Sequence, residues 1–146
     1  MTVEPIRILM AEDDLEDQLL VRKAFMESRA MNGLTFVNDG EELLQYLRRE
    51  GDYASAPFPD ILLLDLNMPR KDGREALQEI KSDPELCSIP VVVLTTSAAD
   101  EDIVRSYQLG ANSYIQKPVT FEKMVEIMDS LGQYWLSIVK LPPNGG

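Results

Sequence analysis

Histidine is absent from this sequence of 146 residues, and cysteine occurs once. Without imidazole, the chain lacks the side chain most often used for proton transfer near neutral pH and the commonest zinc and iron ligand. A phosphohistidine role is excluded on the same ground. The single cysteine, Cys87, cannot form a disulfide within the chain, which is typical of a protein from a reducing cytoplasm.

Long apolar runs and an excess of basic residues are also missing. No apolar run approaches the roughly 18 residues that a membrane-spanning helix needs, and the short acidic start does not resemble a signal peptide. The 14 basic residues are outnumbered by 25 acidic ones, which gives a net charge of −11. Such a chain is not expected to bind nucleic acid or an anionic membrane surface. An anionic substrate would need a cation beside it.

The composition that remains is that of a globular domain. Apolar residues make up 45% of the chain and charged residues 27%, which favours a packed core over disorder. The length predicts a single domain, with a core over about residues 6–132 and a C-terminal extension over residues 133–146.

Short apolar runs alternate along the chain with amphipathic segments. Strands are predicted over residues 6–11, 34–37, 61–64, 91–94 and 113–115. Helices are predicted over residues 15–30, 40–47, 74–82 and 100–108, and from about residue 120 onward. The third and fourth strands lack polar alternation, which is typical of strands buried on both faces of a parallel sheet. The fold class predicted is α/β, a doubly wound (βα)5 flavodoxin-like sheet of five parallel strands in the order 2-1-3-4-5.

Polar side chains follow four of the predicted strands. The segments are Glu12-Asp13-Asp14 after the first, Asp65-Leu66-Asn67 after the third, Thr95-Thr96 after the fourth and Lys117-Pro118 after the fifth. In a doubly wound sheet, ligands bind in the crevice outside the carboxyl ends of the strands, where the strand order reverses. Glu12, Asp13 and Asp65 are therefore expected to meet in one crevice.

Three carboxylates in one crevice predict a cation. Each pair repels by about 1–4 kcal/mol at partly exposed separations, and oxygen ligands without histidine or cysteine favour magnesium, manganese or calcium over zinc. A carboxylate beside such a cation can act as a nucleophile and form an aspartyl phosphate. The ammonium of Lys117 and the hydroxyl of Thr95 can then contact the phosphoryl oxygens.

Five separated motifs occur at the ends of the predicted strands or within them. They are Glu12-Asp13, Asp65-x-Asn67-Met68-Pro69 followed by Asp72-Gly73, Thr95, Tyr114, and Lys117-Pro118. In this order and spacing they resemble the receiver domain of two-component response regulators, over about residues 6–131. The resemblance implies that Asp65 is the phosphoacceptor. It also implies a site for Mg²⁺ (or Mn²⁺) formed by Glu12, Asp13, Asp65 and the backbone carbonyl of Asn67, with Asp13 a direct ligand.

The resemblance implies roles for three further residues. Thr95 and Tyr114 would be the switch pair that reorients on phosphorylation. Lys117 would hold the phosphoryl group, and its bond to Pro118 would be cis. At Thr96 the family usually has a smaller residue, so this side chain is expected to narrow access to Asp65.

A narrower resemblance concerns the partners. The long loop before Pro59 and the ending Trp135–Pro142 are similar to single-domain regulators partnered with bacterial and cyanobacterial phytochrome kinases. This implies a sensor histidine kinase of phytochrome type as the phosphoryl donor, and a cytoplasmic location. No output domain is expected after the last helix, so the signal should leave by contact with a downstream protein target or a phosphotransfer protein. The chain is not expected to be an enzyme beyond gaining and losing its own phosphoryl group.

Three other functions fit the sequence less well. A phosphatase of the dehalogenase type would need an acid at position 67, where an asparagine stands. A flavin- or nucleotide-binding fold would need a Gly-, Ser- and Thr-rich loop after the first strand, where acids stand. A receiver that folds but is never phosphorylated is disfavoured by the intact Asp65, Lys117 and acid pair.

The C-terminal extension is unusually apolar. Large apolar residues occupy six of eight positions, namely Tyr134, Trp135, Leu136, Ile138, Val139 and Leu141. One end of a helix cannot bury all six, so an exposed apolar patch is expected. The prediction is a symmetric homodimer through the helix over residues 100–108, the strand over residues 113–115, the last helix and this tail. The alternative is a tail that folds back over its own sheet edge.

Overall fold

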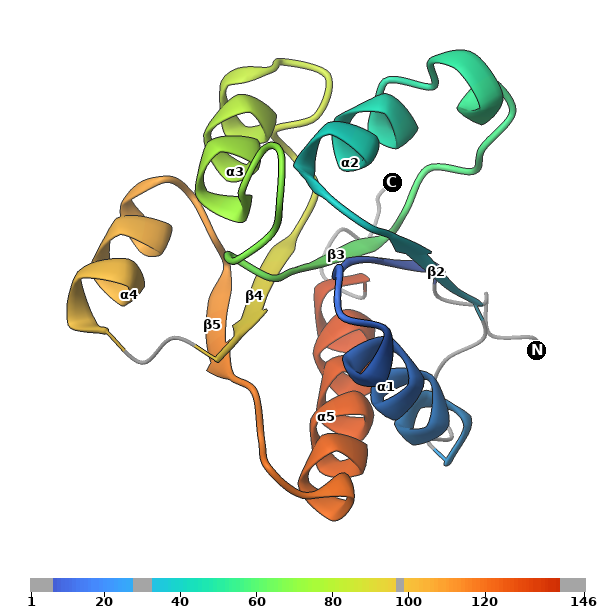
Figure 1. Cartoon of the computed structure of the whole chain (residues 1–146), viewed down its shortest axis with the longest axis vertical. Coiled ribbons are helices and arrows are strands. Elements are labelled where there is room, and N and C mark those ends of the chain that lie inside the picture. Colours follow the sequence, from blue (N-terminus) through green and yellow to red (C-terminus); the bar gives the residue numbers. More distant parts are fainter. Residues whose placement is uncertain (1–6, 28–32, 97–98, 140–146) are drawn as a thin grey trace.

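Five parallel strands form one sheet in the computed structural model, which describes residues 7–27, 33–96 and 99–139. The strands are β1 (Arg7–Ala11), β2 (Gly33–Val37), β3 (Ile61–Leu64), β4 (Val91–Thr95) and β5 (Ser113–Gln116). Their order across the sheet is β2-β1-β3-β4-β5 (Figure 1). The predicted fold class and strand order are confirmed.

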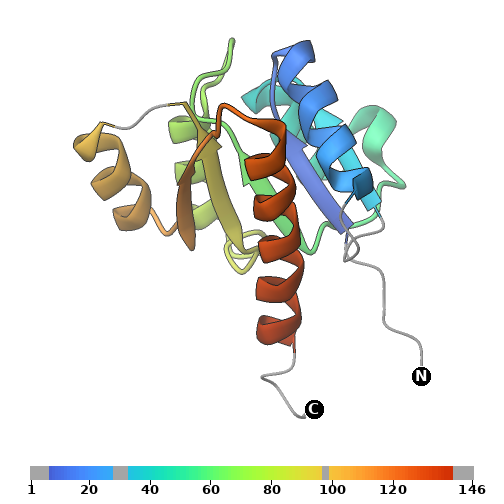
Figure 2. The same cartoon turned by 90° about the horizontal axis from the view of Figure 1, so that it is seen from below.

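Helices cover both faces of this sheet. They are α1 (Leu15–Glu27), α2 (Gly40–Leu47), α3 (Gly73–Ser82), α4 (Asp100–Gln108) and α5 (Phe121–Val139), with a short 3-10 helix, η1 (Gly51–Tyr53), in the loop after α2. Helices α1 and α5 pack side by side on one face, α2 and α3 lie on the other, and α4 lies beside β5 (Figures 1 and 2). The predicted end of α1, near residue 30, lies outside the described residues. None of the described helices is long and apolar enough to cross a membrane.

The apolar strands supply two cores because their side chains alternate between the faces of the sheet. On β1, Leu9 faces the core under α2 and α3, while Ile8 and Met10 face the core under α1 and α5. The residues of β3 and β4 are all buried. This burial on both faces explains why these two runs contain no polar alternation.

Local signals set the starts of two helices. Asp39 is the N-cap of α2, and its side chain accepts a hydrogen bond of 2.8 Å from the backbone N–H of Glu42. Asp72 is the N-cap of α3 and forms a reciprocal capping box with Glu75. A carboxylate at either position satisfies amide groups that the helix itself leaves unpaired.

Gly73 allows α3 to begin close to the end of β3. Its N–H donates to the carbonyl oxygen of Leu66 at 2.9 Å. A Cβ atom at this position would lie 2.2 Å from the carbonyl oxygen of Asp65, well inside van der Waals contact. Any larger residue would therefore displace either the helix or the segment that carries Asp65.

An apolar stripe on α5 packs against the sheet where its side chains are described. Met124, Met128 and Leu131 are buried against the sheet, and Ile127 is partly buried against the same core. The side chain of Trp135 lies outside the described residues. Figure 2 shows α5 running beyond the end of the sheet toward the C-terminus.

Candidate functional site

Four side chains meet at the edge of the sheet where the parallel strands end. Glu12 follows β1, Asp65 follows β3, Thr95 ends β4 and Lys117 follows β5. Glu12 and Thr95 are 0% exposed and Asp65 is 4% exposed. Polar groups buried to this degree need hydrogen-bond partners, and here they bind one another.

Asp65 is bound through both carboxylate oxygens. The hydroxyl of Thr95 donates to Oδ1 at 2.9 Å, and the backbone N–H of Asn67 donates to the same oxygen at 3.1 Å. The ammonium of Lys117 donates to Oδ2 at 3.1 Å. These contacts hold the carboxylate in one orientation, with a cation already beside one of its oxygens.

Lys117 is a buried cation shared by three carboxylates. Its Nζ donates to Asp65, to Asp17 at 2.8 Å and to Glu12, and its side chain is only 8% exposed. Burial lowers the pKa of Lys117, but hydrogen bonds to Asp17 and Glu12 and the charge of Asp65 outweigh burial and raise the pKa above its ordinary value. The ammonium therefore stays charged at neutral pH.

Glu12 is not fully compensated by this lysine. Burial raises the pKa of Glu12 to about 7, although the hydrogen bonds from Lys117 and from the backbone N–H of Asp14 act to lower it. The bond from Asp14 N to Oε2 is 3.0 Å long. Burial outweighs the positive charge of Lys117, and a second cation would further favour the charged form of Glu12.

The donor set fits a hard divalent cation. One carboxylate oxygen each from Glu12, Asp13 and Asp65 lies within 4.8 Å of the other two. Glu12 and Asp65 are buried, whereas Asp13 is exposed and faces the solvent from which an ion enters. Oxygen ligands of this kind suit Mg²⁺ or Mn²⁺. The backbone N–H of Asn67 points to Asp65, and the ligand role of its carbonyl stays a prediction.

Two residues at this site were missed by the sequence analysis. Asp17 binds Lys117. The amide of Gln18 donates to the carbonyl oxygen of Glu12 at 2.5 Å and to Asn38 at 3.0 Å, which fixes the turn that carries the acid pair. Both lie on the first turn of α1, which starts next to the end of β1. Polar residues in a helix turn that directly follows a site strand were the available signal.

One feature implied by the resemblance, the isomer of the Lys117–Pro118 bond, differs in the structure. Cis peptide bonds are absent from the described residues, so the prediction of a cis Lys117–Pro118 bond is wrong for this structure. The bond is trans, as in all but about 5–6% of X–Pro bonds. Tyr114 is paired with Val93 in the sheet, and its backbone N–H donates to the hydroxyl of Tyr107 on α4 at 3.1 Å. Thr95 contacts Asp65 directly, and the role of Thr95 and Tyr114 as a switch pair stays a prediction.

Residues 8–129 match the family model of the response regulator receiver domain. This match covers all five strands except the first residue of β1, and every residue of the site. The chain belongs to this family. The receiver fold explains why the carboxyl ends of β1, β3, β4 and β5 hold the polar residues of this sequence.

Relatives of this receiver include regulators named for phytochromes. This chain is 40% identical to the response regulator Rcp1 of Synechocystis sp. over 138 residues. The aligned residues cover 94% of each chain. The structure of phosphorylated RcpA, a cyanobacterial phytochrome response regulator, has 45% identity and a TM-score of 0.85, with 92% of this chain and 96% of that chain covered. The Mn²⁺-bound structure of Rcp1 has a TM-score of 0.84 at 40% identity, over 94% of this chain and 99% of that chain. The predicted resemblance to phytochrome-partnered regulators is confirmed.

Proposed function

We propose that this receiver accepts a phosphoryl group on Asp65 from a sensor histidine kinase, with Mg²⁺ (or Mn²⁺) bound by Glu12, Asp13 and Asp65, and that it signals by protein contact. One observation carries the proposal. The buried carboxylate of Asp65 is contacted by a hydroxyl from β4 and an ammonium from the end of β5, beside two further acids. This arrangement places an oriented nucleophile next to donors for phosphoryl oxygens.

The residues of this chain have distinct parts in the transfer. A carboxylate oxygen of Asp65 attacks the phosphorus, the bond from phosphorus to the donor nitrogen of the kinase breaks, and that nitrogen leaves with the electron pair of the broken bond. The Lys117 ammonium and the Thr95 hydroxyl, which bind Asp65 at rest, are close enough to donate to the phosphoryl oxygens. A bound divalent cation supplies neutralisation of the charge on those oxygens. The chain transfers the group only to itself, so it is not an enzyme for a separate substrate.

We infer a kinase of phytochrome type from the solved relatives, one of which is described as a cyanobacterial phytochrome response regulator and another as a bacteriophytochrome response regulator. A purified kinase domain of this type, phosphorylated with labelled ATP, should lose its label to this chain on mixing with Mg²⁺. A chelator should prevent the transfer. If the kinase labels a receiver of its own system but never this chain, the phytochrome-type partner is wrong. That result would leave open phosphorylation of Asp65 by a small phosphoryl donor, which tests the acceptor separately.

The switch is proposed to run from Thr95 toward α4. Thr95 binds Asp65, Tyr114 binds α4 through Tyr107, and Arg74 at the start of α3 forms a paired contact with Asp102 on α4 at 2.9 and 2.8 Å. These contacts make α4 and β5 the elements best placed to respond when the oxygens of Asp65 gain a phosphoryl group.

Thr95→Ala is expected to accept phosphate on Asp65 but to lose the response of β5 and α4, because the hydroxyl on β4 that contacts Asp65 is gone. Amide hydrogen exchange before and after phosphorylation measures this response. Thr95→Ser is the matched control, since it keeps the hydroxyl that donates to Asp65, and it should respond as the wild type does. Equal exchange changes in Thr95→Ala and the wild type would remove Thr95 from the switch.

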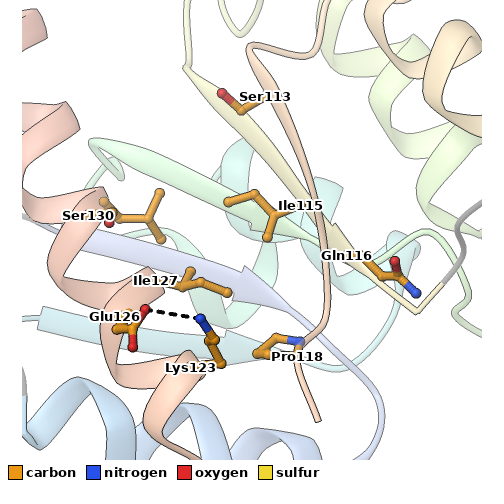
Figure 3. Close-up of a pocket in the computed structure, with 9 residues that line it drawn as sticks. Ser113, Ile115, Gln116, Pro118, Lys123, Glu126, Ile127 and Ser130 are labelled. Carbon is orange, nitrogen blue, oxygen red and sulfur yellow. Dashed lines mark ion pairs between the residues drawn. The ribbon is translucent and has the colours of Figure 1, made fainter. Parts of the chain in front are cut away.

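The homodimer remains a proposal, supported by apolar surface on α4, β5 and α5. Val104 and Tyr107 on α4 are 55% and 49% exposed. A groove of about 520 Å³ lies between β5 and α5 and includes Ile115 and Ile127 among its lining residues. Figure 3 shows these two side chains in the groove, with the ion pair of Lys123 and Glu126 on α5 beside them. The apolar tail that the sequence analysis added to this interface has no described side chains.

The test of the dimer is the mass in solution. Light scattering after size exclusion should give about twice the 16.5 kDa of the chain. A chain cut after Gly132 keeps the residues that match the family model and should fall toward the monomer mass. A full-length chain that stays monomeric at high micromolar concentration, with and without phosphorylation, would contradict the proposal.

A further inference from the structure

We infer that Asp17 competes with the phosphoryl group for Lys117 and so restrains phosphorylation of the site. This rests on the function proposed for Asp65. Asp17 lies on the first turn of α1, and its Oδ2 accepts a hydrogen bond of 2.8 Å from Lys117 Nζ. Neither the receiver motifs quoted above nor the cluster of metal-binding carboxylates includes this residue.

All three N–H donors of Lys117 are occupied in the structure. They go to Glu12, Asp17 and Asp65, and an ammonium group has no fourth donor. A phosphoryl oxygen can therefore bind Lys117 only if one of the three carboxylates gives up its hydrogen bond. The question is which carboxylate stands where the phosphoryl group arrives.

Exposure separates the three carboxylates. The side chains of Glu12 and Asp65 are 1% and 6% exposed, whereas that of Asp17 is 34% exposed. Glu12 and Asp65 therefore hold the ammonium from the buried side, and Asp17 holds it from the solvent side. A phosphoryl group reaches Asp65 from solvent. On the solvent side, the phosphoryl group finds an N–H of Lys117 already bonded to Asp17, and the negative charge of Asp17 repels it.

Asp17 also anchors Lys117. The anchoring favours binding of a phosphoryl group, whereas the competition for Lys117 opposes it. Without Asp17, the ammonium still has two buried carboxylate partners, and its own side chain is 8% exposed. The anchor is therefore largely redundant, whereas the competition is removed completely. Loss of one partly exposed charge pair corresponds to about a fivefold change in an equilibrium constant. We expect a gain of that size in affinity for a phosphoryl group.

Beryllofluoride, a stable mimic of the phosphoryl group on a carboxylate, measures this affinity without turnover. Its dissociation constant should be determined by calorimetry at saturating Mg²⁺ for the wild type and three variants. Asp17→Ala removes both the charge and the hydrogen-bond acceptor and should bind about fivefold more tightly. Asp17→Glu restores a carboxylate and should return toward the wild-type value. Glu16→Gln removes the same charge from an exposed neighbour on the same helical turn and should leave the affinity unchanged.

Two results overturn the inference while leaving the proposed function intact. One is an Asp17→Ala variant that binds beryllofluoride as weakly as the wild type or more weakly, since Asp17 then only anchors Lys117. The other is an equal gain in Glu16→Gln, which would reduce the effect to net charge. A wild type that binds no beryllofluoride at saturating Mg²⁺ would overturn the proposed function and this inference together.

Discussion

Asp65→Asn is expected to abolish phosphorylation by a small acyl phosphate in the presence of Mg²⁺, whereas the wild type should gain one phosphoryl group. The amide that replaces the carboxylate is not a competent nucleophile. Its shape is nearly the same, and its oxygen can still accept the hydrogen bonds that Thr95 and the Asn67 N–H give to Oδ1. The loss should therefore come from the chemistry and not from unfolding, with intact mass as the readout.

Asp60→Asn is the matched control for this variant. Asp60 precedes β3 at the amino end of the parallel strands, away from the site. Its side chain accepts a hydrogen bond of 2.9 Å from the backbone N–H of Arg7. The same substitution at the other end of β3 should leave labelling at the wild-type level. Labelling of Asp65→Asn at the wild-type rate would remove Asp65 as the acceptor.

Asp13→Asn is expected to remove most of the stabilisation that Mg²⁺ gives to the folded chain. Magnesium at ten times its Kd should stabilise the wild type by about 1.4 kcal/mol through mass action. The variant lacks one of three carboxylates whose oxygens lie within 4.8 Å of one another. It should also be more stable than the wild type without metal, because one repulsive charge is gone. Thermal unfolding with and without Mg²⁺ measures both effects.

Asp14→Asn is the control for the metal variant. Asp14 is exposed next to Asp13, and its Oδ1 accepts the backbone N–H of Glu16 at 2.8 Å at the start of α1. Asparagine serves this capping position about as well as aspartate. The control should therefore keep the Mg²⁺ response. A wild type whose melting temperature ignores Mg²⁺ would be evidence against a metal site formed by these carboxylates.

The sequence was sufficient for the fold because its signals are local and repeated. The unbroken apolar runs of β3 and β4 are typical of strands covered on both faces, and in a parallel sheet the polar segments after them lie at the same end of the strands. Glu12, Asp65, Thr95 and Lys117 do meet there. Their contact follows from topology, which is why four residues up to 105 positions apart could be placed together in advance.

The missed contacts depend on side-chain directions, and polar residues in the first turn of α1 were only a weak signal for them. Asp17 looks like any acid in the first turn of a helix, where negative charge is favourable in itself. Only the placement of α1 against the end of β5 brings it to Lys117. The link from Tyr114 to Tyr107 is similar, because it depends on how α4 lies along the edge strand. The isomer of the Lys117–Pro118 bond was taken from the resemblance alone and was wrong.

The central claim is that Asp65 itself carries the phosphoryl group. Borohydride reduction of the phosphorylated protein converts an aspartyl phosphate to homoserine, which peptide mass mapping locates. After treatment of the wild type with a small acyl phosphate and Mg²⁺, the conversion should occur at position 65 and require the metal. Conversion at another carboxylate, or a phosphoryl group found on a hydroxyl side chain with Asp65 unchanged, would contradict the account.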